Sequence, residues 1–145
     1  MTVRHNPLCR AASRMQTINL SFSTYIVPKK NAFRAGVRKD GTPYQYGSAK
    51  AKKSQAGLHK EAERQVKRSI FTMTKKPVEL RVLFKKTEAD CIGLMETLQD
   101  ALEGVIYVND EQVFSSSYRW DWGNALGKNE TCRLQCVELD NISAN

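Results

Sequence analysis

The strongest pattern in the chain lies in one continuous stretch. Residues 77–110 read PVELRVLFKKTEADCIGLMETLQDALEGVIYVND. Apolar residues alternate with polar ones along 78–84, as they do in a strand with one buried face. At 100° per residue, the apolar residues of 91–103 fall on one arc, which predicts an amphipathic helix that stops at Gly104. We therefore expect a strand followed by a helix that buries one face.

The helix expected at 91–103 has two distinct faces. The arc that should be buried holds Cys91, Leu94, Met95, Leu98, Ala101 and Leu102. The opposite arc holds Glu96, Gln99, Asp100 and Glu103. Ile92 lies in the middle of this polar arc, where an apolar side chain is out of place.

Segments on either side complete the predicted fold. Residues 16–27 alternate as a strand, and 112–122 and 131–139 are strand candidates that we expect to form a terminal hairpin. Residues 48–73 predict a long helix capped by Ser48, with a buried stripe at Leu58, Ala62, Val66 and Ile70. This order of elements is typical of a single α+β domain, with a small two-layer mixed sheet packed by two main helices.

The first residues and the first loop differ in composition from the rest. Residues 1–15 lack the apolar stretch of a secretory signal, and we expect a disordered tail there, with a transit peptide as the alternative. The domain should then span 16–145. Within it, residues 28–48 indicate a basic loop or hairpin with a turn at Asp40-Gly41.

Charge divides the chain into two halves. Residues 1–76 carry 17 Lys and Arg against three acids, and residues 77–145 carry six against 12, which together give the net charge of +8. A basic excess of this size makes nucleic acid the first partner to consider. The basic half could hold phosphates and the acidic half a metal, or both could be solvated faces.

Membrane and disulfide chemistry are not indicated. No apolar run approaches the roughly 18 residues needed to cross a bilayer, so no membrane partner is expected. The four cysteines (Cys9, Cys91, Cys132 and Cys136) form no Cys-x-x-Cys pair, and a zinc site would lack its other ligands. We expect reduced structural cysteines in a cytoplasmic protein.

Two carboxylates flank the predicted helix. Asp90 precedes it, and Asp110 follows it after a short apolar segment. Because the helix reverses the chain, we expect both carboxylates to return to the same end of the fold. Mg²⁺ takes carboxylate and phosphate oxygens, and beside a basic surface it can activate water for phosphodiester hydrolysis. Asp90 is equally well explained as the N-cap of the helix.

Residues 90–113 combine several short motifs: Asp90, Asp100-Ala101-Leu102, Gly104-Val105, Tyr107, Asn109-Asp110 and Gln112-Val113. At this spacing they resemble the RusA-like family of Holliday-junction resolvases, small metal-dependent endonucleases common in phages and prophages. The family pattern is Asp-x-Asp-Asn-x-x-Lys, x-x-x-Asp-Ala-Leu, Gly-Val-x-Tyr and (Asp/Asn)-Asp-x-Gln-(Val/Ile). The segment Val27-Pro28-Lys29-Lys30-Asn31 is also similar to the opening Pro-x-Lys-Lys-Asn of this family.

The resemblance implies that Asp90 and Asp110 are catalytic metal ligands. It fails where the second Asp of the family falls on Ile92, its Asn on Gly93 and its active-site Lys on Glu96. Glu96 lies one turn beyond position 92 and could reach back to the metal, as Glu88 could from the strand end. We expect Asp100 to be a surface residue or a support for the ligands, with direct ligation of the metal as the alternative.

The expected DNA contacts are Asn31 and the basic residues around these segments: Lys29, Lys30, Arg34, Arg38, Lys39, Lys85 and Lys86. Three aromatic residues, Tyr118, Trp120 and Trp122, alternate along one strand face. Core or dimer packing is the simplest explanation for them, and base stacking is the alternative.

The sequence therefore predicts an endonuclease dependent on Mg²⁺, with Mn²⁺ as an alternative, that resolves Holliday junctions or other branched double-stranded DNA in recombination and repair. The resemblance and the two-fold symmetry of a four-way junction imply a homodimer. The first alternative is a catalytically impaired RusA-like module that binds branched DNA without efficient cleavage. A basic protein-interaction or RNA-binding domain is the second.

Overall fold

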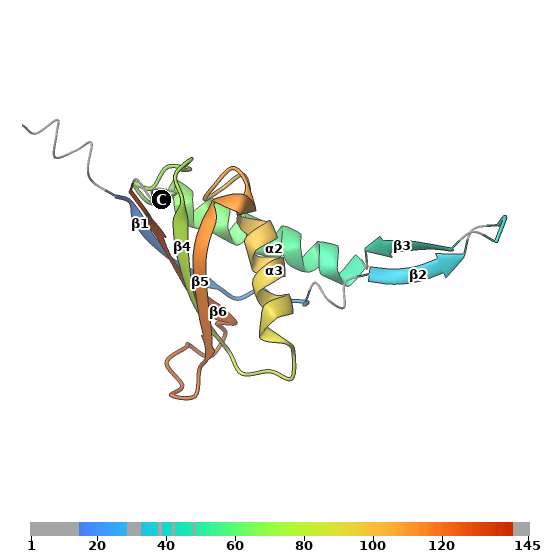
Figure 1. The fold of residues 1–145 in the computed structure, drawn as a ribbon. Coiled ribbons are helices and arrows are strands. Elements are labelled where there is room, and N and C mark those ends of the chain that lie inside the picture. The colour runs from blue at the N-terminus through green and yellow to red at the C-terminus, as the bar shows by residue number, and fades with distance from the viewer. Residues whose placement is uncertain (1–14, 29–32, 38, 42, 48, 141–145) are drawn as a thin grey trace, which may run out of the picture.

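A mixed sheet and two helices form the body of the protein. The computed structural model describes residues 15–28, 33–37, 39–41, 43–47 and 49–140, with the backbone alone for 33–37 and 43–47. The elements are β1 (Thr17–Phe22), β2 (Phe33–Val37), β3 (Pro43–Gly47), α2 (Ala49–Lys67), β4 (Val78–Phe84), α3 (Cys91–Leu102), the 3-10 turn η2 (Asp110–Gln112), β5 (Val113–Trp120) and β6 (Cys132–Glu138). The sheet order is β1-β6-β4-β5, while β2 and β3 form a separate hairpin that extends from the N-terminal end of α2 (Figure 1). The predicted α+β class is confirmed.

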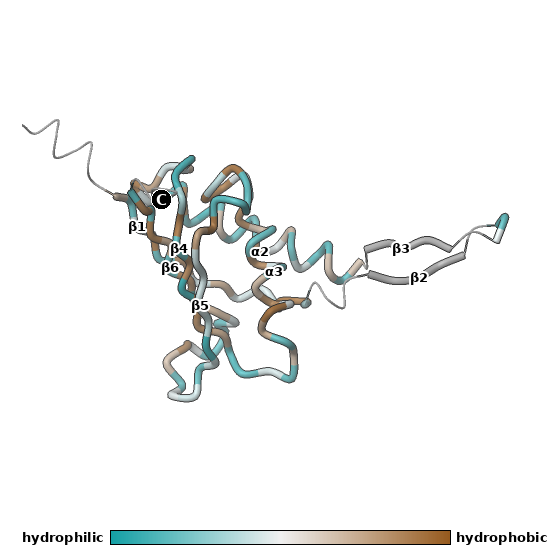
Figure 2. Tube along the Cα trace, viewed as in Figure 1, coloured by the Kyte–Doolittle hydropathy of each residue, from teal (hydrophilic) through white to brown (hydrophobic). Residues whose placement is uncertain are grey.

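Both helices lie on the same side of the sheet (Figure 1). β4 turns Val78, Leu80, Val82 and Phe84 into the core, as its alternation predicts. The predicted buried arc of α3 is also confirmed, because only Cys91 among its six residues is half-buried rather than buried. Ile92 is 58% exposed, as its place on the polar arc indicates. Figure 2 shows the resulting contrast between the hydrophobic residues of the strands and the largely hydrophilic α2.

The last two strands are present, but the predicted hairpin between them is wrong. β4 lies between them, parallel to β5 and antiparallel to β6. A strand–helix–strand connection places its two strands parallel, and α3 provides that connection from β4 to β5. β6 therefore takes the other edge of β4, and the connection between β5 and β6 crosses the end of β4.

The long helix is shorter than predicted. α2 ends at Lys67, and Ile70, expected on its buried stripe, is 98% exposed. The Ser69 hydroxyl donates to the carbonyl of Val66 at 2.8 Å, which satisfies a last-turn acceptor and ends the helix. The remaining predicted stripe is buried at Leu58 and Ala62.

Several predictions concern the first third of the chain. The turn at Asp40-Gly41 is confirmed, because Gly41 has a φ of +88° between β2 and β3. Ser48 and residues 1–14 of the expected tail lie outside the described residues. In the part of the chain that the structure describes, no helix combines the length and apolar character that a membrane span requires.

Two cysteines belong to the core. Cys132 and Cys136 are buried on the same face of β6, and both are free thiols. Burial raises the pKa of the Cys136 thiol to about 12 and raises that of Cys132 as well. Both side chains therefore act as small apolar residues.

Glu130 ties the connection between β5 and β6 to the sheet. Its carboxylate accepts hydrogen bonds from Arg133 at 2.7 Å, from Ser21 and from the Gly127 N–H at 2.6 Å. These bonds, that of Arg133 first, lower the pKa of Glu130 from 4.5 to about 2. The stabilisation is therefore present above about pH 4.5 and is lost as the pH falls toward about 2.

Glu130→Gln is expected to flatten the loss of stability in this acid range. The free energy of unfolding in urea, measured from about pH 5 to about pH 3, should fall less steeply in the variant than in the wild type. Glu111→Gln, which changes an exposed carboxylate, is the matched control. If the free energy of unfolding of Glu130→Gln falls with pH as steeply as that of the wild type, the role of Glu130 in acid stability is contradicted.

Candidate metal centre

Asp90 caps the N-terminus of α3. Its carboxylate accepts the Ile92 N–H at 3.1 Å, and its backbone is extended, with φ −75° and ψ 122°. This is the geometry of an N-cap, so that interpretation of Asp90 is confirmed. The pKa of the neighbouring Cys91 thiol is raised, mainly by burial and in part by the negative charge of Asp90.

Asp110 lies at the opposite end of α3. Its backbone N–H donates to the Glu103 carboxylate at 2.9 Å, and Glu103 is the C-cap of the helix. Asp90 and Asp100 are ten residues apart along the helix, which corresponds to about 15 Å at about 1.5 Å per residue. The prediction that Asp90 and Asp110 meet at one end of the fold is therefore wrong within a single chain.

A tight turn keeps Asp110 at the C-terminal end of α3. Gly104 has a φ of +82°, and its N–H donates to the Tyr107 carbonyl at 2.7 Å. The Ile106 N–H donates to the Leu102 carbonyl at 3.0 Å. These bonds fold the chain onto the last turn of the helix. The segment after Gly104 therefore does not return along α3 toward Asp90, contrary to the prediction from the sequence.

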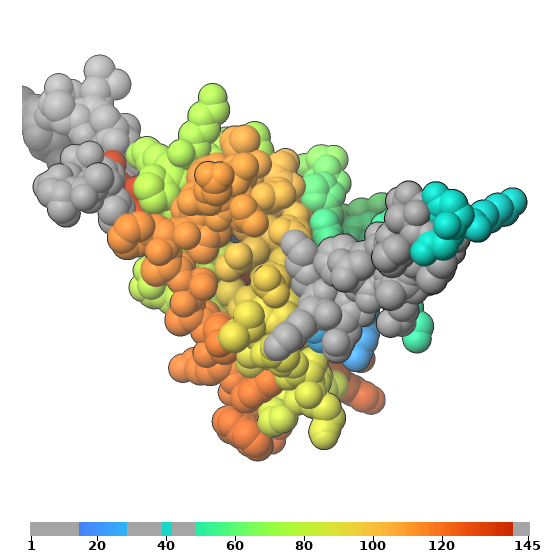
Figure 3. All heavy atoms as spheres, turned by 45° about the vertical axis from the view of Figure 1, so that its right-hand side comes forward, coloured from blue at the N-terminus to red at the C-terminus, as the bar shows by residue number. Residues whose placement is uncertain are grey.

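Three carboxylates gather at this end of the helix. One oxygen each of Asp100, Glu103 and Asp110 lies within 4.8 Å of the other two. Asp100 and Glu103 are three residues apart on α3 and so face the same side, and Asp110 begins η2. Among the described residues this is the only group of three acids, histidines or cysteines with such spacing. Figure 3 shows the two contributing parts, α3 in yellow and the η2–β5 region in orange, side by side on one face.

The other predicted ligands do not join this carboxylate cluster. Glu96 is exposed on α3, one turn before Asp100 on the same side of the helix. Glu88 is exposed in the connection from β4 to α3, at the same end of the helix as Asp90. The structure thus divides the predicted ligands between the two ends of α3, with Glu96 between them.

Gln112 fixes the segment that carries the third carboxylate. Its side-chain oxygen accepts the backbone N–H groups of Val108 and Asn109, at 2.8 and 3.0 Å. Its side-chain nitrogen donates to the carbonyls of Thr74 and Lys76, at 2.9 and 3.0 Å. One side chain therefore joins the start of η2 to the segment before β4.

Tyr107 is a buried residue close to the carboxylate cluster. Its hydroxyl donates to the Gln99 carbonyl at 2.8 Å, and its side chain is fully buried. Burial raises the pKa of this hydroxyl, and negative groups nearby, including all three carboxylates of the cluster, raise it further. The hydroxyl therefore stays protonated and holds the turn against α3.

His59 joins α2 to the same end of α3. Its Nδ1 lies 2.9 Å from the Ala101 carbonyl. Because a carbonyl can only accept, Nδ1 carries the proton and donates. His59 is half-buried and supports the last turn of α3.

Sequence reasoning missed Glu103 and Gln112 as parts of this site. The polar arc of 91–103 already placed Asp100 and Glu103 on one side of the helix, three residues apart. What the sequence did not show is that the turn after Gly104 brings Asp110 to that side. The pattern Asp-x-x-Glu before a glycine stop, followed by Asn-Asp, is the signal that could have found the cluster.

The donor set suits a hard cation. Mg²⁺ takes oxygen ligands and commonly uses only a few carboxylates, with water or phosphate oxygens in its other positions. The cluster offers carboxylates alone, and zinc sites usually draw on cysteine and histidine. Asp110 is exposed while Asp100 and Glu103 are half-buried, so the cluster opens toward solvent at η2.

The predicted DNA contacts are only partly described. Lys29, Lys30, Asn31 and Arg38 lie outside the described residues, and Arg34 is described by its backbone alone. Lys39 is exposed at the tip of the β2–β3 hairpin, and Lys85 and Lys86 are exposed after β4. The Lys86 ammonium lies 4.8 Å from the ring centre of Trp120 and 5.9 Å from that of Trp122. Trp120 is half-buried against Phe84, as core packing predicts, whereas Trp122 is 76% exposed.

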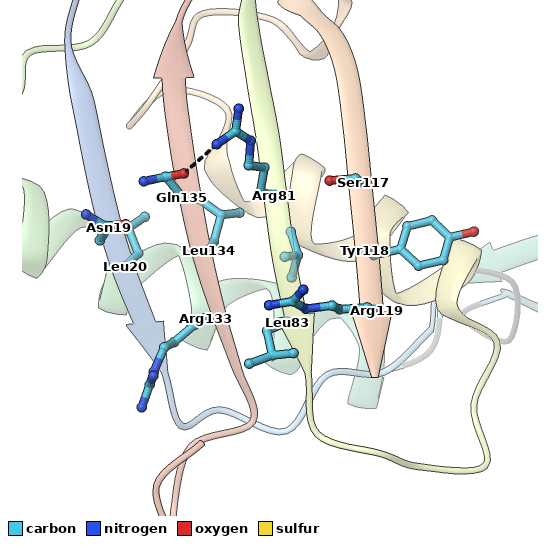
Figure 4. A pocket seen from close by; sticks show the side chains of 11 residues that line it. Asn19, Leu20, Arg81, Leu83, Ser117, Tyr118, Arg119, Arg133, Leu134 and Gln135 are labelled. Atoms are coloured by element: carbon cyan, nitrogen blue, oxygen red, sulfur yellow. Dashed lines mark hydrogen bonds between the residues drawn. The ribbon is translucent and has the colours of Figure 1, made fainter. Parts of the chain in front are cut away.

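A second basic region lies on the open face of the sheet. Arg81, Arg119 and Arg133 line a shallow hollow of about 480 Å³ (Figure 4). Arg81 pairs with Glu79 at 3.2 Å, and Arg133 pairs with Glu130 at 2.7 Å. Two of its three arginines are therefore already neutralised, which makes this face a weaker phosphate site than its composition suggests.

Comparison with known proteins adds no relative. Neither the protein-family models nor the curated proteins contain a match to this chain.

Proposed function

We propose that this protein is a Mg²⁺-dependent endonuclease of the RusA-like kind, which hydrolyses phosphodiester bonds in branched DNA as a homodimer. The observation that carries the proposal is the carboxylate cluster of Asp100, Glu103 and Asp110. It contains Asp110, one of the two aspartates that the resemblance implies as ligands, in a chain of net charge +8. Recombination and repair in the cytoplasm are the matching roles.

Each carboxylate has a distinct place in this proposal. When bound, Mg²⁺ would polarise the phosphate and lower the pKa of an attacking water. Asp110, the exposed member, would be the ligand nearest to the substrate, and the half-buried Asp100 and Glu103 would hold the metal from α3. Basic residues outside the cluster, such as Lys85 and Lys86, attract the phosphates of the DNA.

A DNA-binding module without efficient cleavage is the second candidate. The observation that favours it is Asp90, which caps α3 about 15 Å from the cluster along the helix. If the site is degenerate, the wild type should bind junctions but barely cut them. Ile92→Asp combined with Glu96→Lys, which restores the family pattern, should then raise cleavage.

A cleavage assay on a synthetic four-way junction tests the main proposal. The full chain should cut the junction with Mg²⁺ or Mn²⁺, should not cut it in EDTA, and should spare a linear duplex of the same sequence. Binding measured in EDTA separates the two candidates. A wild type that neither cuts nor binds the junction with any divalent metal would overturn both.

Gln112→Ala is expected to weaken metal-dependent cleavage about 10- to 100-fold, as loss of an outer-shell partner does. The reason is that four backbone groups lose the side chain that holds η2 in place. The Mg²⁺ concentration for half-maximal cleavage should rise, while junction binding in EDTA stays near that of the wild type. Gln112→Glu keeps the acceptor and loses the donors, so its cleavage rate should lie between those of Gln112→Ala and the wild type. An unchanged Mg²⁺ dependence of Gln112→Ala would contradict this role of Gln112.

A further inference from the structure

A short segment after β1 is held firmly against α2. Glu61 accepts the Thr24 N–H at 2.9 Å, and Ser54 accepts the Val27 N–H at 3.1 Å. The Ser54 hydroxyl also donates to the Tyr25 carbonyl at 2.7 Å. A Cβ at Gly57 would lie 2.9 Å from the Thr24 side chain, so glycine is what permits this close approach.

Tyr25 is a fixed aromatic residue on the surface. Its backbone is tied to α2 from both sides, yet its side chain is 68% exposed. Neither an ordinary core role nor a mobile loop explains an exposed ring on an anchored backbone. An aromatic ring held in this way is a surface on which a planar group can stack.

Lysines of α2 line a hollow that Tyr25 borders. Tyr25 borders a hollow of about 640 Å³ whose α2 wall carries Lys50, Lys53 and Lys60. In the described part of the chain none of these lysines forms an ion pair. The first acid of α2 is Glu61, and its carboxylate is occupied by the segment after β1.

A further lysine lines a second hollow beside Tyr25. Tyr25 also borders a smaller hollow of about 190 Å³, which Lys85 lines from the connection after β4. Tyr25 therefore borders both the hollow with the α2 lysines and the hollow with Lys85. Positive charges in two hollows next to an exposed ring match the alternation of phosphates and bases along a nucleic-acid strand.

We propose that Tyr25, with Lys50, Lys53, Lys60 and Lys85, is a binding site for single-stranded DNA. One unpaired base stacks on the Tyr25 ring, and the flanking phosphates lie on the lysines. Lysines alone would serve any polyanion, but a ring can stack only on a base that has left its neighbours in a duplex. The inference rests on the proposed function, since the unpaired nucleotides would be those at the branch point of the junction.

Binding of a labelled oligothymidylate to the full chain in EDTA tests the site, with a duplex of the same length for comparison. Tyr25→Ala should weaken oligothymidylate binding roughly 5- to 150-fold, the range for loss of one base–aromatic stack, and duplex binding much less. Tyr25→Phe, which keeps the ring, should bind as the wild type does. Phe114→Ala is the matched control, because Phe114 is an aromatic residue 60% exposed on β5.

Salt dependence tests the lysines separately. Lys50→Ala combined with Lys53→Ala should reduce the slope of log K against log salt by about 1.4, at about 0.7 per phosphate of a single strand. Lys75→Ala, at an exposed lysine before β4, is the control and should leave the slope unchanged. An unchanged slope in the double variant would remove these lysines from the site.

The outcomes for this site are separate from those for cleavage. The site is overturned if the wild type does not bind oligothymidylate, if Tyr25→Ala binds it as the wild type does, or if Tyr25→Ala weakens duplex binding equally. Tyr25-dependent binding by a protein that cuts no junction would overturn the nuclease proposal alone. If the wild type cleaves junctions with a metal, but Tyr25→Ala binds oligothymidylate as tightly as the wild type does, the single-strand site alone is overturned.

Discussion

Asp110→Asn is expected to abolish cleavage of a four-way junction and to leave junction binding intact or tighter. The variant replaces one of the three carboxylates of the cluster with a neutral amide, which is a weaker metal ligand. The loss should exceed the roughly 100-fold that removal of an outer-shell partner costs. Binding should not suffer, because the substitution takes one negative charge away from the phosphates. Single-turnover cleavage and binding in EDTA measure the two effects, and a variant that cuts at the wild-type rate would refute the metal centre.

Asp90→Asn is the informative partner of this variant. Asparagine caps helices about as well as aspartate, so the substitution removes the charge of Asp90 and keeps its bond to the Ile92 N–H. If the metal centre lies wholly at the C-terminal end of α3, Asp90→Asn should cut as the wild type does. Asp90→Ala should then cost stability, typically about 1 kcal/mol, and still leave the chemistry in place.

Loss of cleavage in both variants would have a different meaning. About 15 Å of helix separates Asp90 from the cluster, so one metal site could use both carboxylates only if they came from two chains. A mixture of the two inactive variants tests this arrangement. Each mixed dimer would hold one site with both carboxylates intact, and cleavage would return.

The sequence predicted the parts of the fold that depend on local periodicity. The bounds of β4 and the buried arc of α3 followed from the spacing of apolar residues, and the exposure of Ile92 followed from its place on the polar arc. The hairpin of β5 and β6 was wrong because strand order depends on contacts between distant segments. β5 and β6 follow each other in the sequence, and no local pattern indicates that β4 lies between them.

The candidate site was predictable only in part, for a related reason. Periodicity placed Asp100 and Glu103 on one face, and the spacing around Gly104 marked the end of the helix. The position of Asp110 depends on the turn that follows, where Gln112 bonds to carbonyls of the segment before β4. Those bonds join residues 36 and 38 positions apart, which no local pattern reveals.

Leu98→Ala is expected to lower the free energy of unfolding by about 2–5 kcal/mol, the range for a fully buried leucine. Leu98 is 0% exposed in the middle of α3, where it packs in the core shared by the helices and the sheet. Ile92→Ala is the matched control on the same helix and should change stability by no more than about 0.5 kcal/mol, because Ile92 is 58% exposed. Urea unfolding at neutral pH measures both.

The same pair of variants also bears on the proposed homodimer. If a second copy covers Ile92, the cost of Ile92→Ala should grow with protein concentration, since binding of a partner stabilises the folded state by mass action. The cost of Leu98→Ala should stay constant, because its packing lies within one chain. A Leu98→Ala variant no less stable than Ile92→Ala would mean that α3 is not anchored at its centre. The carboxylates at its C-terminal end would then lack the rigid support that a metal centre needs.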